Sequence, residues 1–202
     1  SGSNIEKLLE HQRTLKNEVY QIVALVTDCT EQEGSRARTI AHNNGISVVE
    51  NSKTAFLKKH GKEKFGRDQA LRQEFDQNTL NMLMQDGYDQ TPVAAFGGYM
   101  TLASKMLVNK ILCVNVHPAD LRITRDGKPA YTGDNAVEQA MELGEPHLSS
   151  TTHIAIPKKD EGPILMVSAP MKTDYSKYQA NREKSIKDNQ SNLKEFGDWK
   201  IF

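Results

Sequence analysis

Residues 111–121 read Ile-Leu-Cys-Val-Asn-Val-His-Pro-Ala-Asp-Leu, an apolar run that ends on two polar side chains and stops at a proline. Such a run is typical of a buried strand that carries chemistry at its carboxyl end. Asn115 and His117 are two residues apart, and this spacing places both side chains on the same face of a strand. An amide donor beside an imidazole suits a carbonyl oxygen, so the pair is a candidate site.

An isolated Asn-x-His pair also has a plainer interpretation, in which Asn115 caps a turn and His117 is a hydrogen-bonded histidine at a strand edge. The sequence that follows favours a site. Thr151 to Ile156 (Thr-Thr-His-Ile-Ala-Ile) predicts a second strand, and Ile164 to Ala169 predicts a third. The carboxylate of Asp160 therefore lies in the loop between two strands of the predicted core.

Composition excludes several classes of protein. The chain has 202 residues, 37% of them hydrophobic, and its 26 basic residues balance 26 acidic ones, so no basic field calls for nucleic acid or a membrane surface. The two cysteines form neither a metal spacing nor a disulfide framework, which fits a reducing cytoplasm. Neither a membrane-spanning run nor a signal peptide is visible in the sequence. We therefore expect a soluble, cytoplasmic protein with neither nucleic-acid nor membrane partners.

Strand and helix patterns alternate along the first half of the chain. Strands are predicted at residues 20–26, 46–49 and 92–96, and helices at residues 35–43 and 67–86. This alternation favours parallel strand pairing through helical crossovers, hence an α/β fold with a doubly wound, mostly parallel sheet. A polar, amphipathic helix is predicted over residues 178–196.

Two motifs together resemble a known family. Asn-Val-His-Pro at residues 115–118 is followed by a Gly-containing loop, a short helix, and Thr-x-His-x₆-Asp-x-Gly-Pro-Ile at residues 151–164. This order resembles the folate-dependent formyltransferases, most of all the phosphoribosylglycinamide formyltransferases, over about residues 1 to 170. The resemblance implies a Rossmann-like fold and 10-formyltetrahydrofolate as co-substrate, with no metal.

The same resemblance implies a catalytic set of Asn115, His117 and Asp160. Formyl transfer to an amine passes through a tetrahedral intermediate with a negatively charged oxygen, so we expect Asn115 and a protonated His117 to donate to that oxygen. We expect Asp160 to raise the pKa of His117 and to orient its ring. The family counterpart of His153 lies near the site without being catalytic, and we assign His153 a structural role.

The folate contacts implied by the resemblance come from two segments. Gly-Tyr-Met-Thr-Leu at residues 98–102 is similar to the family's Gly-Tyr-Met-Arg-Ile, with threonine in place of arginine, and the segment after His117 also departs from the family's Ser-Leu-Leu-Pro. The implied folate-binding residues are Tyr99, Met100, Thr101, Leu102, Ile156 and Pro157.

The chain opens with Ser-Gly-Ser-Asn before residues at helical spacing. Taken alone, this start fits equally an anion-binding cradle of backbone N–H groups and a remnant of a cloning vector. The resemblance favours the cradle and implies that Gly2, Ser3 and Asn4 hold a substrate phosphate. The family's first strand should precede this loop and is missing from the given sequence, so we expect a trimmed chain or an upstream segment.

We predict an enzyme that transfers a formyl group from 10-formyltetrahydrofolate to the amine of a small, phosphorylated substrate, similar to the phosphoribosylglycinamide of purine biosynthesis. One alternative is a formyltetrahydrofolate hydrolase, in which water is the acceptor. Another is a folate-binding module without transferase activity, which the departures at Thr101 and after His117 suggest.

We expect one domain over residues 1–202, with a Rossmann-like half at 1–110 and a catalytic half with the C-terminal helix at 111–202. A homodimer is one arrangement that the sequence leaves open.

Overall fold

The fold was determined as a computed structural model, which describes the chain except residues 1, 17–18, 31–34, 89, 91–92 and 98–102. Two compact units are present, Ser1–Leu112 and Cys113–Phe202. Elements of the first unit are α1 (Ser3–Thr14), β1 (Ala24–Thr27), α2 (Arg36–Asn43), β2 (Ser47–Glu50), α3 (Lys53–Lys59), α4 (Gln69–Gln85), β3 (Val93–Phe96) and α5 (Lys105–Lys110). Those that follow are β4 (Leu112–His117), β5 (Thr124–Arg125), β6 (Lys128–Pro129), α6 (Ala136–Glu142), β7 (His147–Leu148), β8 (Thr151–Ile154), β9 (Ile164–Val167), β10 (Met171–Lys172), α7 (Arg182–Leu193), the π-helix η1 (Lys194–Asp198) and α8 (Trp199–Ile201).

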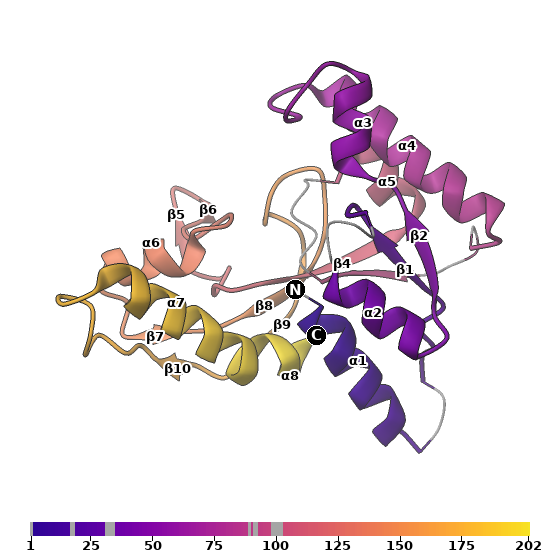
Figure 1. The fold of residues 1–202 in the computed structure, drawn as a ribbon. Helices are drawn as coiled ribbons and strands as arrows, with labels where there is room; N and C mark the ends of the chain where they lie inside the picture. Colours follow the sequence, from indigo (N-terminus) through magenta and orange to yellow (C-terminus); the bar gives the residue numbers. More distant parts are fainter. Residues whose placement is uncertain (1, 17–18, 31–34, 89, 91–92, 98–102) are drawn as a thin grey trace. The chain divides into compact units, whose positions relative to one another are not determined.

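The first unit contains a β-α-β arrangement of the predicted kind. Strands β1 and β2 are parallel, with Leu25 opposite Val48, and α2 connects them (Figure 1). Helix α1 packs on this arrangement through Leu9, which lies with Ala41 and Ile46 in one apolar cluster. The predicted crossover and the α/β class are therefore confirmed.

A second apolar cluster joins α3 and α4. Phe56, Phe65 and Phe75 pack edge to face or tilted, with ring centroids 5.2–6.1 Å apart. Of the predicted stripe on α4, Leu71, Phe75 and Leu83 are buried and Met82 is half-buried. The stripe is therefore core, as its helical spacing indicates.

Helix α4 begins with a side-chain cap that can be tested. The carboxylate of Asp68 accepts a hydrogen bond from Leu71 N at 3.0 Å, which satisfies one of the free N–H groups of the first turn. We expect Asp68→Ala to lower the free energy of unfolding by about 1 kcal/mol, measured by urea denaturation. Asp68→Asn keeps an oxygen acceptor and should change stability much less. Equal losses in both variants would contradict the capping role.

The second unit is built around antiparallel pairs. Strand β8 pairs antiparallel with β4 and with β9, and a register shift interrupts the β8–β9 pair between Thr152 and His153. The parallel pairing of the first unit thus gives way to antiparallel pairing around the candidate site. Strand β8 ends at Ile154, two residues earlier than predicted, so Ile156 and Pro157 lie in the loop towards Asp160.

Helices α6 and α7 cover the apolar core of the second unit (Figure 1). Tyr131, Val137, Met141 and Leu193 are the larger side chains of this core, each at most 2% exposed. Helix α7 starts at Arg182, later than the predicted residue 178, because Asn181 caps it by accepting from Lys184 N. Among the described residues, no helix is long and apolar enough to cross a membrane.

Candidate active site

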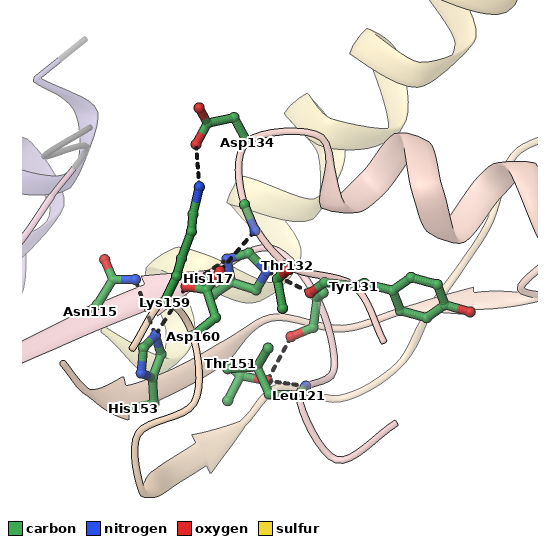
Figure 2. Close-up of polar contacts among 12 residues, drawn as sticks. Asn115, His117, Leu121, Tyr131, Thr132, Asp134, Thr151, His153, Lys159 and Asp160 are labelled. Carbon is green, nitrogen blue, oxygen red and sulfur yellow. Dashed lines mark hydrogen bonds and ion pairs between the residues drawn. The ribbon is translucent and has the colours of Figure 1, made fainter. Parts of the chain in front are cut away.

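Strand β4 presents Asn115 and His117 on one face, as their spacing predicts. The antiparallel partner β8 places His153 directly opposite Asn115 and Thr151 opposite His117. His117 and His153 are 4% and 2% exposed, whereas Asn115 is half-buried. The carboxyl end of β4 and its partner strand β8 therefore bring two imidazoles and an amide together (Figure 2).

The loop between β8 and β9 adds a buried carboxylate. Asp160 Oδ1 lies 3.6 Å from His117 Nδ1 and 3.8 Å from His153 Nε2, so the same oxygen faces both rings (Figure 2). Asp160 has a φ of 57°, in the left-handed region that few residues other than glycine adopt. Local backbone strain of this kind is typical of functional positions, where surrounding contacts impose it.

A glycine in the loop before α6 fixes the other carboxylate oxygen. Gly133 N donates to Asp160 Oδ2 at 2.8 Å, and a Cβ at residue 133 would lie 2.9 Å from Lys159 Nζ. The Lys159 ammonium in turn lies 3.5 Å from Asp134 Oδ1. The two loops therefore meet over the carboxylate, and the missing side chain of Gly133 makes room for the lysine.

Hydrogen bonds with the backbone assign a tautomer to His153. Its Nδ1 lies 3.1 Å from Ile154 O, which can only accept, so Nδ1 carries the proton. Nε2 then accepts from Asn115 Nδ2 at 3.1 Å. A primary amide has a second N–H, and this geometry directs the first to His153 while leaving the second for a ligand oxygen.

Burial decides the charge of His117. Burial lowers its pKa more than Asp160 and the Tyr131 carbonyl raise it, while His153 and Lys159 add smaller lowering effects. Asp160 thus acts in the expected direction, but the net pKa lies below the ordinary value. A lowered pKa favours the neutral imidazole, in contrast to the protonated His117 expected from the sequence. Burial also lowers the pKa of His153, against raising effects from Ile154 O and Asp160.

These lowered pKa values predict how stability depends on pH. The unfolded histidines have a pKa of about 6.5, so below that pH the unfolded state binds more protons than the folded state. The contribution of these two histidines to the free energy of unfolding should be fully present above pH ~6.5. It should be lost as the pH drops towards the pKa values of the folded state. Urea midpoints at several pH values between about 7.5 and 5.5 measure this slope.

The matched variants for this measurement are His117→Gln and His42→Gln. Removing the buried His117 should flatten the pH slope, and the exposed His42 on α2 is the surface position used for comparison. A slope in His117→Gln identical to that of the unchanged protein would contradict the effect of burial.

The remaining predicted site residues belong to three other segments of the sequence. Gly2, Ser3 and Asn4 form the start of α1 in the first unit, where Gly2 has a φ of 78° and a Cβ would lie 2.7 Å from Ala37 N. Ile156 is half-buried and Pro157 is exposed, and both precede Asp160 in its loop. Tyr99, Met100, Thr101 and Leu102 lie outside the described residues. Within the described part of the chain, no group of three or more His, Cys, Asp or Glu side chains could hold a metal ion.

Sequence reasoning missed three partners in this cluster. His153 was assigned a structural role without its partners, which are the Asn115 amide and, 3.8 Å from the same Nε2, the Asp160 carboxylate. Gly133 was visible as a glycine before a helix, without any sign that its N–H meets Asp160. The Tyr131 carbonyl, 2.9 Å from His117 Nε2, has no sequence signature because every residue has a carbonyl.

Comparison with known proteins identifies a family for this chain. The family described as formyl transferase matches residues 1–193. A phosphoribosylglycinamide formyltransferase from Bacillus halodurans aligns with a TM-score of 0.66 at 19% identity, covering 96% of this chain and 86% of the other. The enzyme of that name from Campylobacter jejuni subsp. jejuni aligns with a TM-score of 0.67 at 19% identity, covering 96% and 88%.

A formyltetrahydrofolate deformylase from Pseudomonas putida also aligns, with a TM-score of 0.60 at 19% identity, covering 96% of this chain and 59% of that protein. At such identities the structures establish the shared Rossmann-like fold, and the family match covers nearly the whole chain. The chain belongs to the formyl transferase family of one-carbon enzymes, whose co-substrate is a formyl-tetrahydrofolate.

Proposed function

We propose that the protein transfers the formyl group of 10-formyltetrahydrofolate to the amine of a small, phosphorylated acceptor such as phosphoribosylglycinamide, a step of purine biosynthesis in the cytoplasm. The observation that carries this proposal is the buried cluster of Asn115, His117, His153 and Asp160, which combines an amide donor with groups that can move one proton. Formyl transfer to an amine needs both.

In the reaction, the amine nitrogen forms a bond to the formyl carbon, and the bond between that carbon and the folate nitrogen breaks. The formyl oxygen becomes negatively charged in between. We propose that the second N–H of Asn115 donates to this oxygen, because the first N–H holds the amide against His153. Preorganised donors of this type contribute about 10²- to 10³-fold in rate.

A proton must also leave the attacking amine and reach the departing folate nitrogen. A neutral His117 is ready to accept it, since burial holds its pKa below the ordinary value. The carboxylate of Asp160, 3.6 Å away, then stabilises the charged ring until the proton is passed on. Our proposed roles are therefore oxyanion donor for Asn115, proton carrier for His117 and charge stabiliser for Asp160.

We place the folate beside Tyr99, Met100, Thr101 and Leu102 together with Ile156 and Pro157, as the family motif implies. We place the acceptor's phosphate at Gly2, Ser3 and Asn4. The start of α1 supports the second placement, because backbone N–H groups of a first helical turn attract anions. The close approach of Gly2 to Ala37 also brings the start of α1 beside the start of α2.

The deformylase match favours a second candidate, in which water replaces the amine as acceptor. One experiment separates the candidates. The protein is incubated with 10-formyltetrahydrofolate, with and without phosphoribosylglycinamide, and formylated amine and free formate are quantified by mass spectrometry. Formylated amine supports the transferase, and formate released without amine supports the hydrolase.

Isothermal titration with a folate analogue accompanies this assay. Binding without either product would leave a folate-binding module as the function, and absence of both binding and products would contradict the proposal. Glycinamide riboside without phosphate is the control acceptor. A much higher KM for this compound would support the phosphate site at the start of α1.

A further inference from the structure

Outside the groups used so far, one buried side chain is tied to the candidate site through its main chain. Tyr131 is 2% exposed, and its carbonyl oxygen lies 2.9 Å from His117 Nε2 (Figure 2). We infer that Tyr131 is a positioning residue that holds neutral His117 as the Nε2–H tautomer, so that Nδ1, facing Asp160, is the atom on which the proton is gained and lost. The catalytic part of this inference rests on the proposed function.

The tautomer follows from the chemistry of the contact. A carbonyl oxygen can only accept, so Nε2 must carry a hydrogen to bond with it. In a neutral imidazole the other nitrogen then has the lone pair, and Nδ1 lies 3.6 Å from Asp160 Oδ1. A proton taken up on Nδ1 therefore arrives beside a carboxylate, while the bond to Tyr131 is kept in both states of the ring.

The neighbouring histidine shows the opposite arrangement. His153 donates from Nδ1 to Ile154 O and accepts on Nε2 from Asn115. Two buried histidines at one site are thus held in different tautomers by two main-chain carbonyls. This difference gives each ring a distinct spectroscopic signature and separates their roles, because the lone pair of His153 already accepts from Asn115, whereas that of His117 faces Asp160.

The position of the Tyr131 carbonyl depends on what holds the side chain. The ring packs in the core with Ala136 and Val137, and the hydroxyl donates to Glu145. Arg125 lies above the ring, with its guanidinium carbon 5.7 Å from the ring centroid, and donates to the hydroxyl at 3.4 Å. Burial, followed by the hydrogen bond with Glu145, raises the pKa of Tyr131 to about 12, so the hydroxyl remains a donor at neutral pH.

Glu145 is itself a fixed anchor. Its N–H donates to Ala140 O at 3.0 Å at the end of α6, and its carbonyl accepts from Thr173 Oγ1 at 2.7 Å and Tyr175 OH at 3.0 Å. A chain of contacts therefore runs from the backbone after α6 through the Tyr131 ring to the catalytic imidazole. Removing the tyrosine hydroxyl loosens this chain without removing the ring from the core.

The test combines nitrogen NMR with kinetics on the full chain. In ¹⁵N-labelled protein above pH ~7, where a histidine of ordinary pKa is neutral, we expect His117 as the Nε2–H tautomer and His153 as the Nδ1–H tautomer. Signals are assigned by comparison with His117→Gln and His153→Gln. A dominant Nδ1–H form of His117 would overturn the inference.

Tyr131→Phe is the main variant and Tyr178→Phe the matched control, since Tyr178 lies in the same unit and its hydroxyl accepts from Arg182. We expect Tyr131→Phe to give a mixture of His117 tautomers, to lower the pKa seen in the pH–rate profile and to reduce kcat about three- to tenfold, because a weakened hydrogen bond is worth about 0.5–1.5 kcal/mol. KM for the folate should not change. A folded variant with unaltered tautomer and pH profile would contradict the role of Tyr131.

Glu145→Gln keeps the size of the anchor and serves as the second variant if Tyr131→Phe does not fold. It should shift the His117 tautomer in the same direction, and no shift in it would count against the inference. Failure of the proposed function has a different signature. If the unchanged protein gives neither formylated amine nor formate, the proposed function fails, while the NMR result still decides whether Tyr131 sets the tautomer.

Discussion

Asp160→Asn should reduce formyl transfer by about 10²- to 10³-fold, with the loss mainly in kcat. The substitution keeps the size of the side chain, and asparagine tolerates the left-handed backbone that residue 160 adopts with a φ of 57°. Its amide oxygen can still accept from Gly133 N. What disappears is the negative charge beside both histidines, so the pKa of His117 falls further below its ordinary value and the charged ring is no longer stabilised.

Asp134→Asn provides the matched control for this result. It removes the same charge from an exposed residue whose partner is Lys159, and the side chain of Asp134 is 64% exposed. Steady-state kinetics against pH, with the urea midpoint of each variant, measure the outcome. We expect near-normal turnover in Asp134→Asn. Full activity and an unchanged pH profile in Asp160→Asn would reduce Asp160 to a turn residue.

The second large effect is expected for Gly162→Ala, in the loop that carries Asp160. A Cβ at residue 162 would lie 1.7 Å from Ile154 O, a backbone atom at the end of β8, so the backbone must move. Ile154 is held there because its N–H donates to Pro163 O at 2.9 Å, and the next N–H donates to Cys113 O at 2.8 Å. We expect a loss of about 3 kcal/mol or more in unfolding free energy, at the upper end for overpacked sites.

Activity should fall as well, because Ile154 O is the acceptor that sets the His153 tautomer and Asp160 is two residues from the clash. Displacement of a catalytic group by about 1 Å can cost about 10²-fold in rate. Gly127→Ala is the control, since Gly127 has a φ of 73° in the β5–β6 turn with open space around it. It should cost only about 1–2 kcal/mol from backbone strain, with unaltered turnover. Equal stability losses in both variants would show that the contact with Ile154 is unimportant.

The sequence predicted the parts of this structure that depend on periodicity. Strand β4, with Asn115 and His117 on one face, follows from alternation and proline, and the β1-α2-β2 crossover follows from alternating strand and helix patterns. Apolar residues at these spacings share one face of a strand or helix, so forming that element allows all of them to be buried away from water together. The pattern therefore predicts the element.

Other features depend on pairing across the chain and had no such pattern. The register of β4 with β8 determines that His153 lies opposite Asn115, and a shift of one residue would turn it to the other face. An ion pair of His117 with Asp160 can be suspected from sequence, whereas the depth of burial that lowers the His117 pKa cannot. Main-chain partners such as Tyr131 O and Gly133 N also could not be predicted, because backbone groups of this kind occur all along the chain and have no sequence signature.

Asp160 Oδ1 faces both His117 and His153, and this limits how many protons the two rings can bind together. One carboxylate can compensate one positive charge, and the charge on either imidazole opposes the charging of the other, as the lowering of the His117 pKa by His153 shows. The two rings therefore titrate as a pair, in which burial opposes the first proton and the charge of the first proton further opposes a second. We therefore expect the two rings together to hold no more than one proton at a time. Under the proposed transfer, each proton taken from an amine would therefore have to leave the cluster before the next is accepted.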